Sequence, residues 1–413
     1  MARHLFTGGQ VFDGTGTPPA PADVLVEDGV IVAVGDDVRR EPAADDATVL
    51  DLAGRTLLPG LIDAHVHLTL SGINVLDRLY KPFSYHFFQA VENCRKTIAT
   101  GITTVRDGGG ADLGLKQAIA SGLIEGPRTL ISVNMISQTG GHNDGHLSCG
   151  LDVHLFPQHP GVPSGIADGP DEVRRTVRTM LRAGADVIKV ATTGGVLSPS
   201  DDPRHAHFTP AELDVLVAEA TAGDAHVMAH AQGAEGIKNA VRAGARSIEH
   251  GIYLDDEAVE LMLANGTWLV PTLIAPTSVI EAAQRGEVHE PGVLDKALQV
   301  AATHRESIAK AVEAGVKIAF GTDTGIGPHG DNLRELHLLT ECGLTPYQAW
   351  AAATSGSAEL LGLGDRIGKV RAGHVADLTV IDGPLTDLSG LAGRVAETWR
   401  EGRRVYRRDE RNA

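Results

Sequence analysis

The segment LRAGADVIKVATTGG, residues 181–195, shows the pattern that decides the fold. It begins as the end of a helix, passes through Gly184, and continues as a run rich in valine and isoleucine. Glycine suits the left-handed backbone position that closes many helices. A short apolar run after such a glycine is typical of a parallel strand that is covered on both faces. The segment therefore predicts a helix-to-strand junction of an α/β protein.

The same pattern recurs through the middle of the chain. Four more copies occupy residues 98–109, 241–251, 263–273 and 312–325. Three further strand-like runs occupy residues 60–68, 127–137 and 224–233. Eight β/α units over about 300 residues predict a (β/α)8 TIM barrel. An open doubly wound sheet is the alternative, and it is disfavoured because no G-x-G-x-x-G opens a helix after the first strand.

The two ends of the chain differ from the middle. Residues 1–57 and 367–413 contain short β-like runs that are interrupted by glycine and aspartate. We expect both ends to combine in one small β-sandwich domain beside a hydrolase barrel at 58–366. Residues 150–170 are rich in glycine and proline and predict a long loop at the active face. A second irregular stretch is expected at 276–291.

Composition limits the class of protein. The 413 residues are 42% apolar and 22% charged, which is a globular balance. A formal charge of −17, without a dense basic cluster, argues against nucleic acid as a partner. Three scattered cysteines argue against a disulfide framework and against thiolate zinc. No stretch resembles a signal peptide or a membrane span, so we expect a cytoplasmic homo-oligomer that acts on a small molecule.

Two histidines interrupt the apolar run GLIDAHVHLTL, residues 60–70. In a strand, His65 and His67 project from the same face because side chains alternate. Two neutral imidazoles side by side suit a metal ion. The alternative is a pair of core histidines bonded to backbone carbonyls, and the pair alone leaves both interpretations open.

Four more polar residues occupy matching positions in other predicted strands: Lys189, His230, His250 and Asp323. All lie near the carboxyl ends of their strands, the face where barrel active sites are built. Lys189 lies between Ile188 and Val190, where an unpaired ammonium would be costly to bury. It could pair with Asp323, or its neutral amine could react with CO2 to form a carbamate. Four imidazoles, a carbamate and a carboxylate would satisfy two Zn²⁺ ions.

The sequence resembles the amidohydrolase superfamily over nearly its whole length. Within it, the chain is similar to the branch of binuclear zinc Xaa-Pro dipeptidase-like and carboxypeptidase-like enzymes related to imidazolonepropionase. The motifs that carry the resemblance are GGQVFDGTG, LPGLIDAHVHL, GITTVRDGGG, DVIKVATTGGVLSP, AHAQGAEGIKNAVRAG, SIEHG, GTDTG and GKVRAGHVADLTVIDGPL. The context of Lys189 and the motif QTGGHND favour the peptidase-like branch. The resemblance implies a TIM barrel with a β-sandwich made from both chain ends.

The resemblance also implies roles for the six polar residues. His65, His67 and Asp323 would bind one metal, His230 and His250 the other, and carbamylated Lys189 would bridge them. The expected cofactors are two Zn²⁺ ions, with Mn²⁺ or Co²⁺ as alternatives. The expected nucleophile is a bridging hydroxide, and Asp323 would carry its proton to the leaving nitrogen.

Four residues are candidates for substrate binding: His142, His329, Arg106 and Gln232. The resemblance implies that His142, in QTGGHND, helps to bind the substrate. Arg106 could clamp a carboxylate, although pairing with Asp107 is the favoured alternative. Gln232 stands where some dipeptidase relatives have tyrosine, which weakens the transfer of a specificity for proline dipeptides.

The expected activity is hydrolysis of the amide bond of a dipeptide or N-acyl amino acid, with release of the C-terminal residue. One alternative is a cyclic amide or imide hydrolase of the imidazolonepropionase or dihydropyrimidinase kind. Lys189 argues against the imidazolonepropionase type, which usually binds one metal and lacks the bridging lysine. Another alternative is a non-catalytic protein with the same fold. It is disfavoured because all six expected ligands are present.

Overall fold

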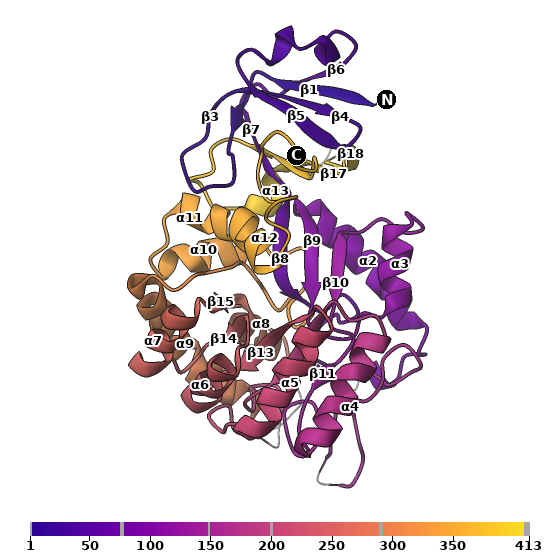
Figure 1. The fold of residues 1–413 in the computed structure, drawn as a ribbon, viewed down its shortest axis with the longest axis vertical. Helices are drawn as coiled ribbons and strands as arrows, with labels where there is room; N and C mark the ends of the chain where they lie inside the picture. The colour runs from indigo at the N-terminus through magenta and orange to yellow at the C-terminus, as the bar shows by residue number, and fades with distance from the viewer. Residues whose placement is uncertain (1, 75–77, 148, 199–200, 289–291, 409–413) are drawn as a thin grey trace.

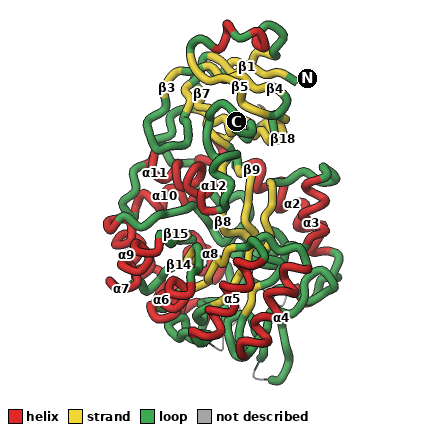
Figure 2. Tube along the Cα trace, viewed as in Figure 1, coloured by secondary structure: helices red, strands yellow, loops and turns green. Residues whose placement is uncertain are grey.

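The structure is a computed structural model that describes residues 2–408 except 75–77, 148, 199–200 and 289–291. Strands from both ends of the chain lie together at one end of the molecule (Figure 1). The parallel strands of the middle segment fill the other end, and helices lie around them (Figure 2).

The parallel strands form two sheets. The first has the order β10-β9-β8 and the second the order β11-β12-β13-β14-β15. Their bounds are β8 (Leu61–Val66), β9 (Ile102–Asp107), β10 (Arg128–Ile131), β11 (Met135–Ile136), β12 (Val187–Ala191), β13 (His226–Ala231), β14 (Ser247–His250) and β15 (Trp268–Val270). Every residue of β8, β9 and β12 is buried, as strands covered on both faces require.

Helices alternate with these strands and follow them along the chain. Their bounds are α2 (Tyr85–Ala99), α3 (Leu113–Ala120), α4 (Gly169–Arg182), α5 (Pro210–Ala222), α6 (Ala234–Ala243), α7 (Asp256–Asn265), α8 (Ile274–Gln284), α9 (Val293–Ala314), α10 (Arg334–Glu341), α11 (Pro346–Ala351), the π-helical η3 (Ala352–Gly356), α12 (Ser357–Leu360) and α13 (Leu391–Arg394). Glycines in the left-handed conformation end α6, α7 and α9, which confirms the helix ends expected from the repeated pattern.

The strands do not form one continuous ladder of eight. The third expected strand, residues 127–137, divides into β10 and β11, with Val133 at a φ of 68° between them. β10 pairs with β9 and β11 pairs with β12, so the break separates the two parallel sheets. The fold is therefore barrel-like, and the third expected strand is two short strands instead of one.

The eighth expected strand, residues 317–325, is also irregular. It bonds to β15 through the Leu269–Ile318 bridge and to β8 through the Val66–Thr324 bridge, both parallel. The backbone of Asp323 has a φ of 57°, which interrupts an extended conformation. The segment thus lies between β15 and β8 as the last barrel strand would, without a regular ladder.

The two ends of the chain form two mixed sheets. One contains β1 (Arg3–Thr7), β4 (Asp23–Glu27), β5 (Val30–Gly35) and β6 (Thr48–Asp51), with η1 (Val38–Arg40) and η2 (Pro42–Ala44) between β5 and β6. The other contains β2 (Gln10–Val11), β3 (Ala20–Pro21), β7 (Arg55–Pro59), β16 (Leu378–Asp382), β17 (Val395–Arg400) and β18 (Arg403–Arg407). One apolar cluster joins side chains of both sheets, among them Phe6, Val24, Leu57 and Trp399.

The two expected irregular stretches differ in outcome. Within the loop expected at 150–170, residues 150–168 contain isolated bridges and neither a named strand nor a helix, as a long loop requires, and α4 begins at Gly169. Residues 276–291 were expected to be irregular, but α8 occupies the first part, so that expectation is wrong; residues 289–291 lie outside the described residues. α8 begins where the Glu335 carboxylate accepts hydrogen bonds from the Leu273 and Ile274 amides, at 2.9 and 2.8 Å.

Candidate active site

The structure brings all six expected metal ligands to one pocket. His65, His67, Lys189, His230, His250 and Asp323 line it, together with His142 and Gln232. The pocket has a volume of about 660 Å³ including its mouth. β8, β12, β13 and β14 present these residues at or near their carboxyl ends, and Asp323 follows the irregular segment beside β8.

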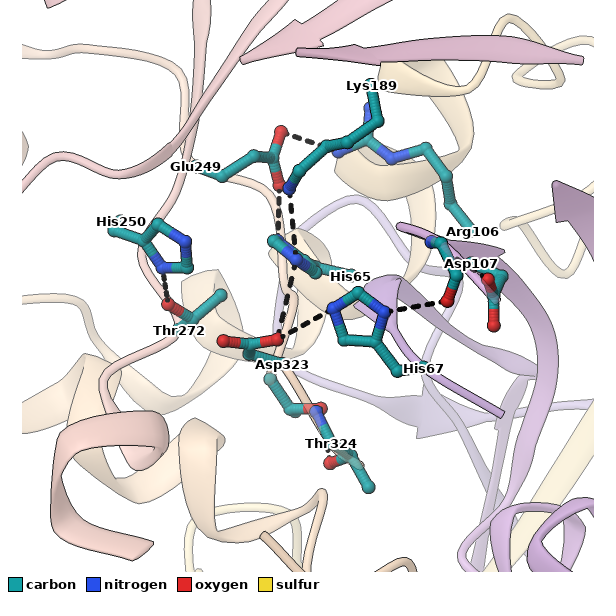
Figure 3. Close-up of polar contacts among 12 residues, drawn as sticks. His65, His67, Arg106, Asp107, Lys189, Glu249, His250, Thr272, Asp323 and Thr324 are labelled. Atoms are coloured by element: carbon teal, nitrogen blue, oxygen red, sulfur yellow. Dashed lines mark hydrogen bonds and ion pairs between the residues drawn. The ribbon is translucent and has the colours of Figure 1, made fainter. Parts of the chain in front are cut away.

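His65, His67 and Asp323 form a compact group within the pocket (Figure 3). One ligand atom from each lies within 4.8 Å of the other two. The Nε2 atom of His67 is 3.1 Å from Asp323 Oδ1, and the Nε2 atom of His65 is 3.5 Å from the same oxygen. The three side chains thus point their donor atoms at one small volume.

Hydrogen bonds fix the orientation of both rings. His67 Nδ1 lies 2.9 Å from the carbonyl oxygen of Gly109, and His65 Nδ1 lies 2.8 Å from Glu249 Oε2. A carbonyl or carboxylate oxygen only accepts, so each Nδ1 carries the hydrogen and donates it. Each neutral ring therefore presents its lone pair at Nε2. Metal-binding histidines are commonly held in this way by a second hydrogen bond.

This arrangement is incomplete without a positive charge. A neutral His67 would place a lone pair of Nε2 against the lone pairs of Asp323 Oδ1, and Oδ1 has no hydrogen-bond donor among the described residues. Either a second proton on His67 or a metal cation between the atoms removes this conflict. The carboxylate raises the pKa of His67 despite its burial, which is the effect expected of a position that attracts a cation. The residues fit a divalent metal.

His230 and His250 supply a second pair of imidazoles. His230 Nε2 donates to the Gly194 carbonyl at 3.1 Å, which leaves its Nδ1 as the lone-pair atom. His250 Nδ1 lies 2.6 Å from Thr272 Oγ1. The two rings are 4.6 Å apart between centroids, and burial holds the pKa of each well below its usual value. Both rings are therefore neutral at pH 7 and able to bind a metal.

Backbone strain accompanies two of these ligands. His250 has a φ of 75° and Asp323 a φ of 57°, values that residues with a side chain rarely adopt. Such conformations persist only where the surrounding structure enforces them, and they concentrate at functional sites. Both residues line the pocket, each at or beyond the end of its strand segment.

Lys189 lies between the two groups of imidazoles. Its Nζ is 3.2 Å from His65 Nε2, and the residue is 2% exposed. The alternative pairing with Asp323 is not found, since no carboxylate of the described chain lies within ion-pair distance of Nζ. Burial lowers the pKa of Lys189 to about 8, although Glu249 and Asp323 act in the opposite direction. The neutral fraction at pH 7 is therefore larger than for an ordinary lysine, although the protonated form still predominates.

Glu249 is a site residue that sequence reasoning missed. It is 0% exposed and accepts hydrogen bonds from His65 and from Arg106, the latter at 2.9 Å. Burial alone would raise the pKa of Glu249, but Arg106 and His65 hold it well below its usual value. The available signal was an acidic residue directly before His250 in the predicted strand SIEH, now β14. Glu249 thus joins the buried Arg106 to the Nδ1 side of the His65 ring, opposite the Nε2 atom that faces the pocket.

The structure does not support the expected role of Arg106. Its guanidinium is fully buried and donates to the Ala64 carbonyl, Ser247 Oγ and the Glu249 carboxylate. The expected pair with Asp107 is wrong, because Asp107 accepts instead from the backbone amides of residues 68, 109 and 111. Arg106 is not among the pocket-lining residues and has no free donor face for a substrate.

The other substrate-binding candidates divide into two groups. His142 stacks on His230 at 4.3 Å between ring centroids, with its Nδ1 3.4 Å from Asp201 Oδ2. Gln232 is 5% exposed, and its Oε1 has no partner among the described residues. His329 lies behind the pocket, bonded to Thr97 and to the Leu70 carbonyl. His142 and Gln232 thus remain candidates by position, whereas His329 is wrong as a residue of the pocket lining.

The remaining wall of the pocket is apolar. Two residues of the long loop, Leu155 and Phe156, contribute to it, and further side chains are Val196, Leu197, Ile252 and Ile326. The Phe156 ring lies 5.2 Å from the His67 ring between centroids. The loop predicted at the active face therefore packs against His67, one of the expected metal ligands.

Imidazoles, a buried lysine and a carboxylate at the carboxyl ends of parallel strands define a metal-dependent hydrolase. The chain belongs to the amidohydrolase family, whose sequence model matches residues 56–405. Like other members, it is an enzyme that hydrolyses amide bonds, and the family is metal-dependent. In the described part of the chain, no helix combines the length and apolar character needed to cross a membrane.

Individual relatives agree with this assignment. Ochratoxinase of Aspergillus niger is 34% identical over 422 residues, which cover 97% of this chain and 86% of that protein. A solved Xaa-Pro dipeptidase with bound methionine in its active site superposes with a TM-score of 0.88 at 33% identity, covering 98% and 100% of the two chains. A prolidase complexed with N-methylphosphonate-L-proline gives a TM-score of 0.89 at 32% identity, with the same coverage. These neighbours identify the fold as TIM-barrel-like α/β.

Proposed function

We propose that the protein is a binuclear metal-dependent amidohydrolase that cleaves the amide bond of a dipeptide or N-acyl amino acid and releases the C-terminal residue. The observation that carries the proposal is the arrangement of two groups of ligands in one pocket. His65, His67 and Asp323 form one group, His230 and His250 the other, with Lys189 between them. The relatives named ochratoxinase, Xaa-Pro dipeptidase and prolidase support a substrate in which the amide bond involves an amino acid.

The two groups would each hold one divalent cation, with Zn²⁺ as the best match for imidazole-rich ligation. Bound there, the cations supply Lewis-acid polarisation of the amide carbonyl and a water with a pKa near neutrality. Asp323 moves the proton in this scheme. Its Oδ1 faces the pocket without a hydrogen-bond donor and accepts the proton of the attacking water. It then returns that proton to the amide nitrogen as the C–N bond breaks.

Lys189 joins the two groups when its neutral amine reacts with CO2. A bond forms between Nζ and the carbon of CO2, and the amine releases one proton, so that the side chain becomes an anionic carbamate. The lowered pKa of Lys189 favours this reaction because it increases the neutral fraction. The product offers two oxygen ligands in place of a cation, which suits a site between two metals.

Replacement of Lys189 by alanine tests this step. We expect Lys189→Ala to hold fewer than two metals per chain and to lose the dependence of metal content on bicarbonate. Metal content is measured by mass spectrometry of the dialysed protein, and the carbamate of the parent by ¹³C NMR with labelled bicarbonate. Lys317→Ala is the matched control because Lys317 pairs with Glu359 at the surface. Two metals retained by Lys189→Ala, with no carbamate signal in the parent, would contradict the bridge.

The apolar wall of the pocket favours substrates with an apolar side chain on one side of the scissile bond. Burial of one such side chain contributes roughly 1.5–3 kcal/mol to binding. We therefore expect metal-loaded enzyme, supplied with bicarbonate, to release leucine- or phenylalanine-like residues from a library of dipeptides and N-acyl amino acids faster than charged residues. Mass spectrometry of the released amino acids measures this preference. No release from any member, with two metals bound, would overturn the proposed reaction.

The finer architecture is part of the proposal. We place the parallel strands and the segment 317–325 in one closed barrel at 58–366, and the two mixed sheets in a sandwich made from 1–57 and 367–413. The apolar cluster shared by the mixed sheets supports the sandwich. Hydrogen bonds from β15 and β8 to the irregular segment support the closure. The homo-oligomeric state and the cytoplasmic location remain predictions.

A further inference from the structure

His250 is held by a different kind of group from the other three imidazoles of the pocket. The other three rings lie against a carboxylate or a backbone carbonyl, which can only accept a hydrogen bond. The Nδ1 atom of His250 instead lies 2.6 Å from the hydroxyl oxygen of Thr272 (Figure 3). A hydroxyl can donate as well as accept, so the direction of this bond decides whether Nε2 of His250 carries a hydrogen or a lone pair.

Thr272 has a strained backbone. Its φ is 53°, in the left-handed region that a β-branched residue rarely adopts, and the residue is 0% exposed. A glycine would adopt this conformation freely. Residues that keep a side chain in such a conformation concentrate at functional sites. The strain therefore indicates that the side chain of Thr272 is needed beside His250, whose own φ of 75° lies in the same region.

Two neighbouring helices hold the backbone on either side of this contact. Glu335 of α10 accepts hydrogen bonds from the amides of the two residues that follow Thr272, at 2.9 and 2.8 Å. His304 of α9 donates from Nε2 to the carbonyl oxygen of His250 at 2.8 Å. Glu335 is 0% exposed and His304 is 1% exposed, so both contacts are shielded from water. The positions of the ring and the hydroxyl are therefore set by the surrounding fold as well as by their own bond.

The pocket favours the direction in which His250 donates to Thr272. If Thr272 donated instead, Nε2 of His250 would carry the hydrogen, and no acceptor for that hydrogen is found among the described residues of the pocket. If His250 donates, its Nε2 carries a lone pair. The neighbouring ring of His230, 4.6 Å away between centroids, also has a free lone pair, at Nδ1. Two neighbouring imidazoles with free lone pairs suit one cation.

We propose that Thr272 is a positioning residue for the metal of the group formed by His230 and His250. Its hydroxyl accepts the Nδ1 hydrogen of His250 and so keeps the lone pair of that ring on Nε2, where a cation can bind it. Thr272 does not line the pocket, so it acts only through His250. This inference rests on the proposed two-metal site and adds the residue that prepares one of its ligands.

The first test compares Thr272→Val with Thr272→Ser in metal titrations. Valine keeps the branched shape but cannot accept a hydrogen bond, whereas serine keeps the hydroxyl. We expect the affinity for the second metal to fall about 10–100-fold in Thr272→Val and to return to near the parental value in Thr272→Ser. The affinity for the first metal should stay unchanged in both variants. Titration with Co²⁺, followed by visible absorption in the presence of bicarbonate, measures the two affinities.

Thr97 provides a matched control for these titrations. Its buried hydroxyl also lies beside the Nδ1 atom of a histidine, His329 at 3.2 Å, but His329 lies behind the pocket. Thr97→Val should therefore bind both metals as the parent does. Parental affinity for the second metal in Thr272→Val would overturn the inference. Equal losses in Thr272→Val and Thr272→Ser would also overturn it, because the hydroxyl would then not be the group that matters.

The tautomer of His250 is a second readout, which a merely structural role of Thr272 would not change. In the full chain with ¹⁵N-labelled histidine and no metal, NMR shows which ring nitrogen of a neutral imidazole carries the hydrogen. The signals of His250 are assigned by their absence in His250→Asn. We expect the hydrogen on Nδ1 in the parent and in Thr272→Ser, and a shift of population toward Nε2 in Thr272→Val. A hydrogen on Nε2 in the parent would overturn the inference.

Failure of this inference can be distinguished from failure of the proposed function. Two metals in the parent, with parental affinities in Thr272→Val, would overturn the role of Thr272 and leave the proposed reaction intact. Two metals in the parent without turnover of any amide would overturn the reaction, whereas the affinities would still report on Thr272. A parent that binds only one metal at saturating supply would overturn the two-metal site and the role of Thr272 together.

Discussion

Asp323→Asn should lower kcat by about 10²-fold or more while the protein keeps most of its metal. The amide oxygen of asparagine can still act as a ligand, but the side chain no longer accepts a proton at neutral pH. Asp323 Oδ1 has no hydrogen-bond donor of its own in the described chain, and Asp323 is the only carboxylate in the group of His65, His67 and Asp323. Steady-state rates on the best substrate of the library measure the loss.

The same preparation supplies the controls for this variant. Metal content per chain shows whether the loss of rate comes from proton transfer or from an empty site. Asp171→Asn is a matched aspartate change at an exposed position, and it should leave kcat unaltered. If Asp323→Asn turned over at a near-normal rate with both metals bound, the role of Asp323 in moving the proton would be excluded.

Glu249→Ala should have the largest effect on stability. The carboxylate is fully buried and joins Arg106, also fully buried, to His65. Its removal leaves a guanidinium in the core without a counter-ion, which typically costs about 3–5 kcal/mol in the free energy of unfolding. The same change frees the Nδ1 atom of His65, and loss of such a hydrogen bond weakens metal binding by about 10–100-fold. Urea denaturation and metal titration measure the two effects.

Glu219 provides a matched control for this prediction. It also pairs with two arginines, Arg174 and Arg178, but these lie near the surface between α4 and α5. Ion pairs there contribute about 0–1 kcal/mol, so Glu219→Ala should change the free energy of unfolding little and leave metal binding intact. Equal destabilisation by the two variants would show that burial of the Arg106 pair is not what makes Glu249 important.

The six expected metal ligands could be found in the sequence because their signals are local. Alternation along a strand put His65 and His67 on one face, and the repeated helix–glycine–strand pattern located the ends of the strands that carry the other four. Each of these inferences needs only the periodicity of one element. The structure accordingly brings all six residues to one pocket.

The partnerships between distant residues could not be found in the same way. Arg106 and Glu249 are 143 positions apart, and nothing in the spacing of either strand indicates their contact. The neighbouring Asp107 was the natural partner by sequence, but adjacent residues of a strand point to opposite faces. The contact between Phe156 and His67 likewise depends on a loop that folds back over the pocket.

Backbone irregularities explain the errors in the fold. No glycine marks the break between β10 and β11 in the sequence, because the residue in the left-handed conformation there is Val133, which is β-branched. Pro276 was taken as the start of an irregular stretch, but it is the third residue of α8. Proline is tolerated in the first turn of a helix, because the missing N–H has no intrahelical partner there.

The pairing of β7 with β16 has a consequence for biosynthesis. The register aligns Pro59 with Leu378. β7 is therefore synthesised early in translation, but its partner β16 is synthesised only near the end. Until then, one edge of β7 exposes the backbone groups of buried residues such as Leu57 and Leu58. A nascent chain that stalls after α12 would present this unpaired edge to other chains, as aggregation-prone intermediates do. Synthesis of β16 is thus the event that covers this edge of β7.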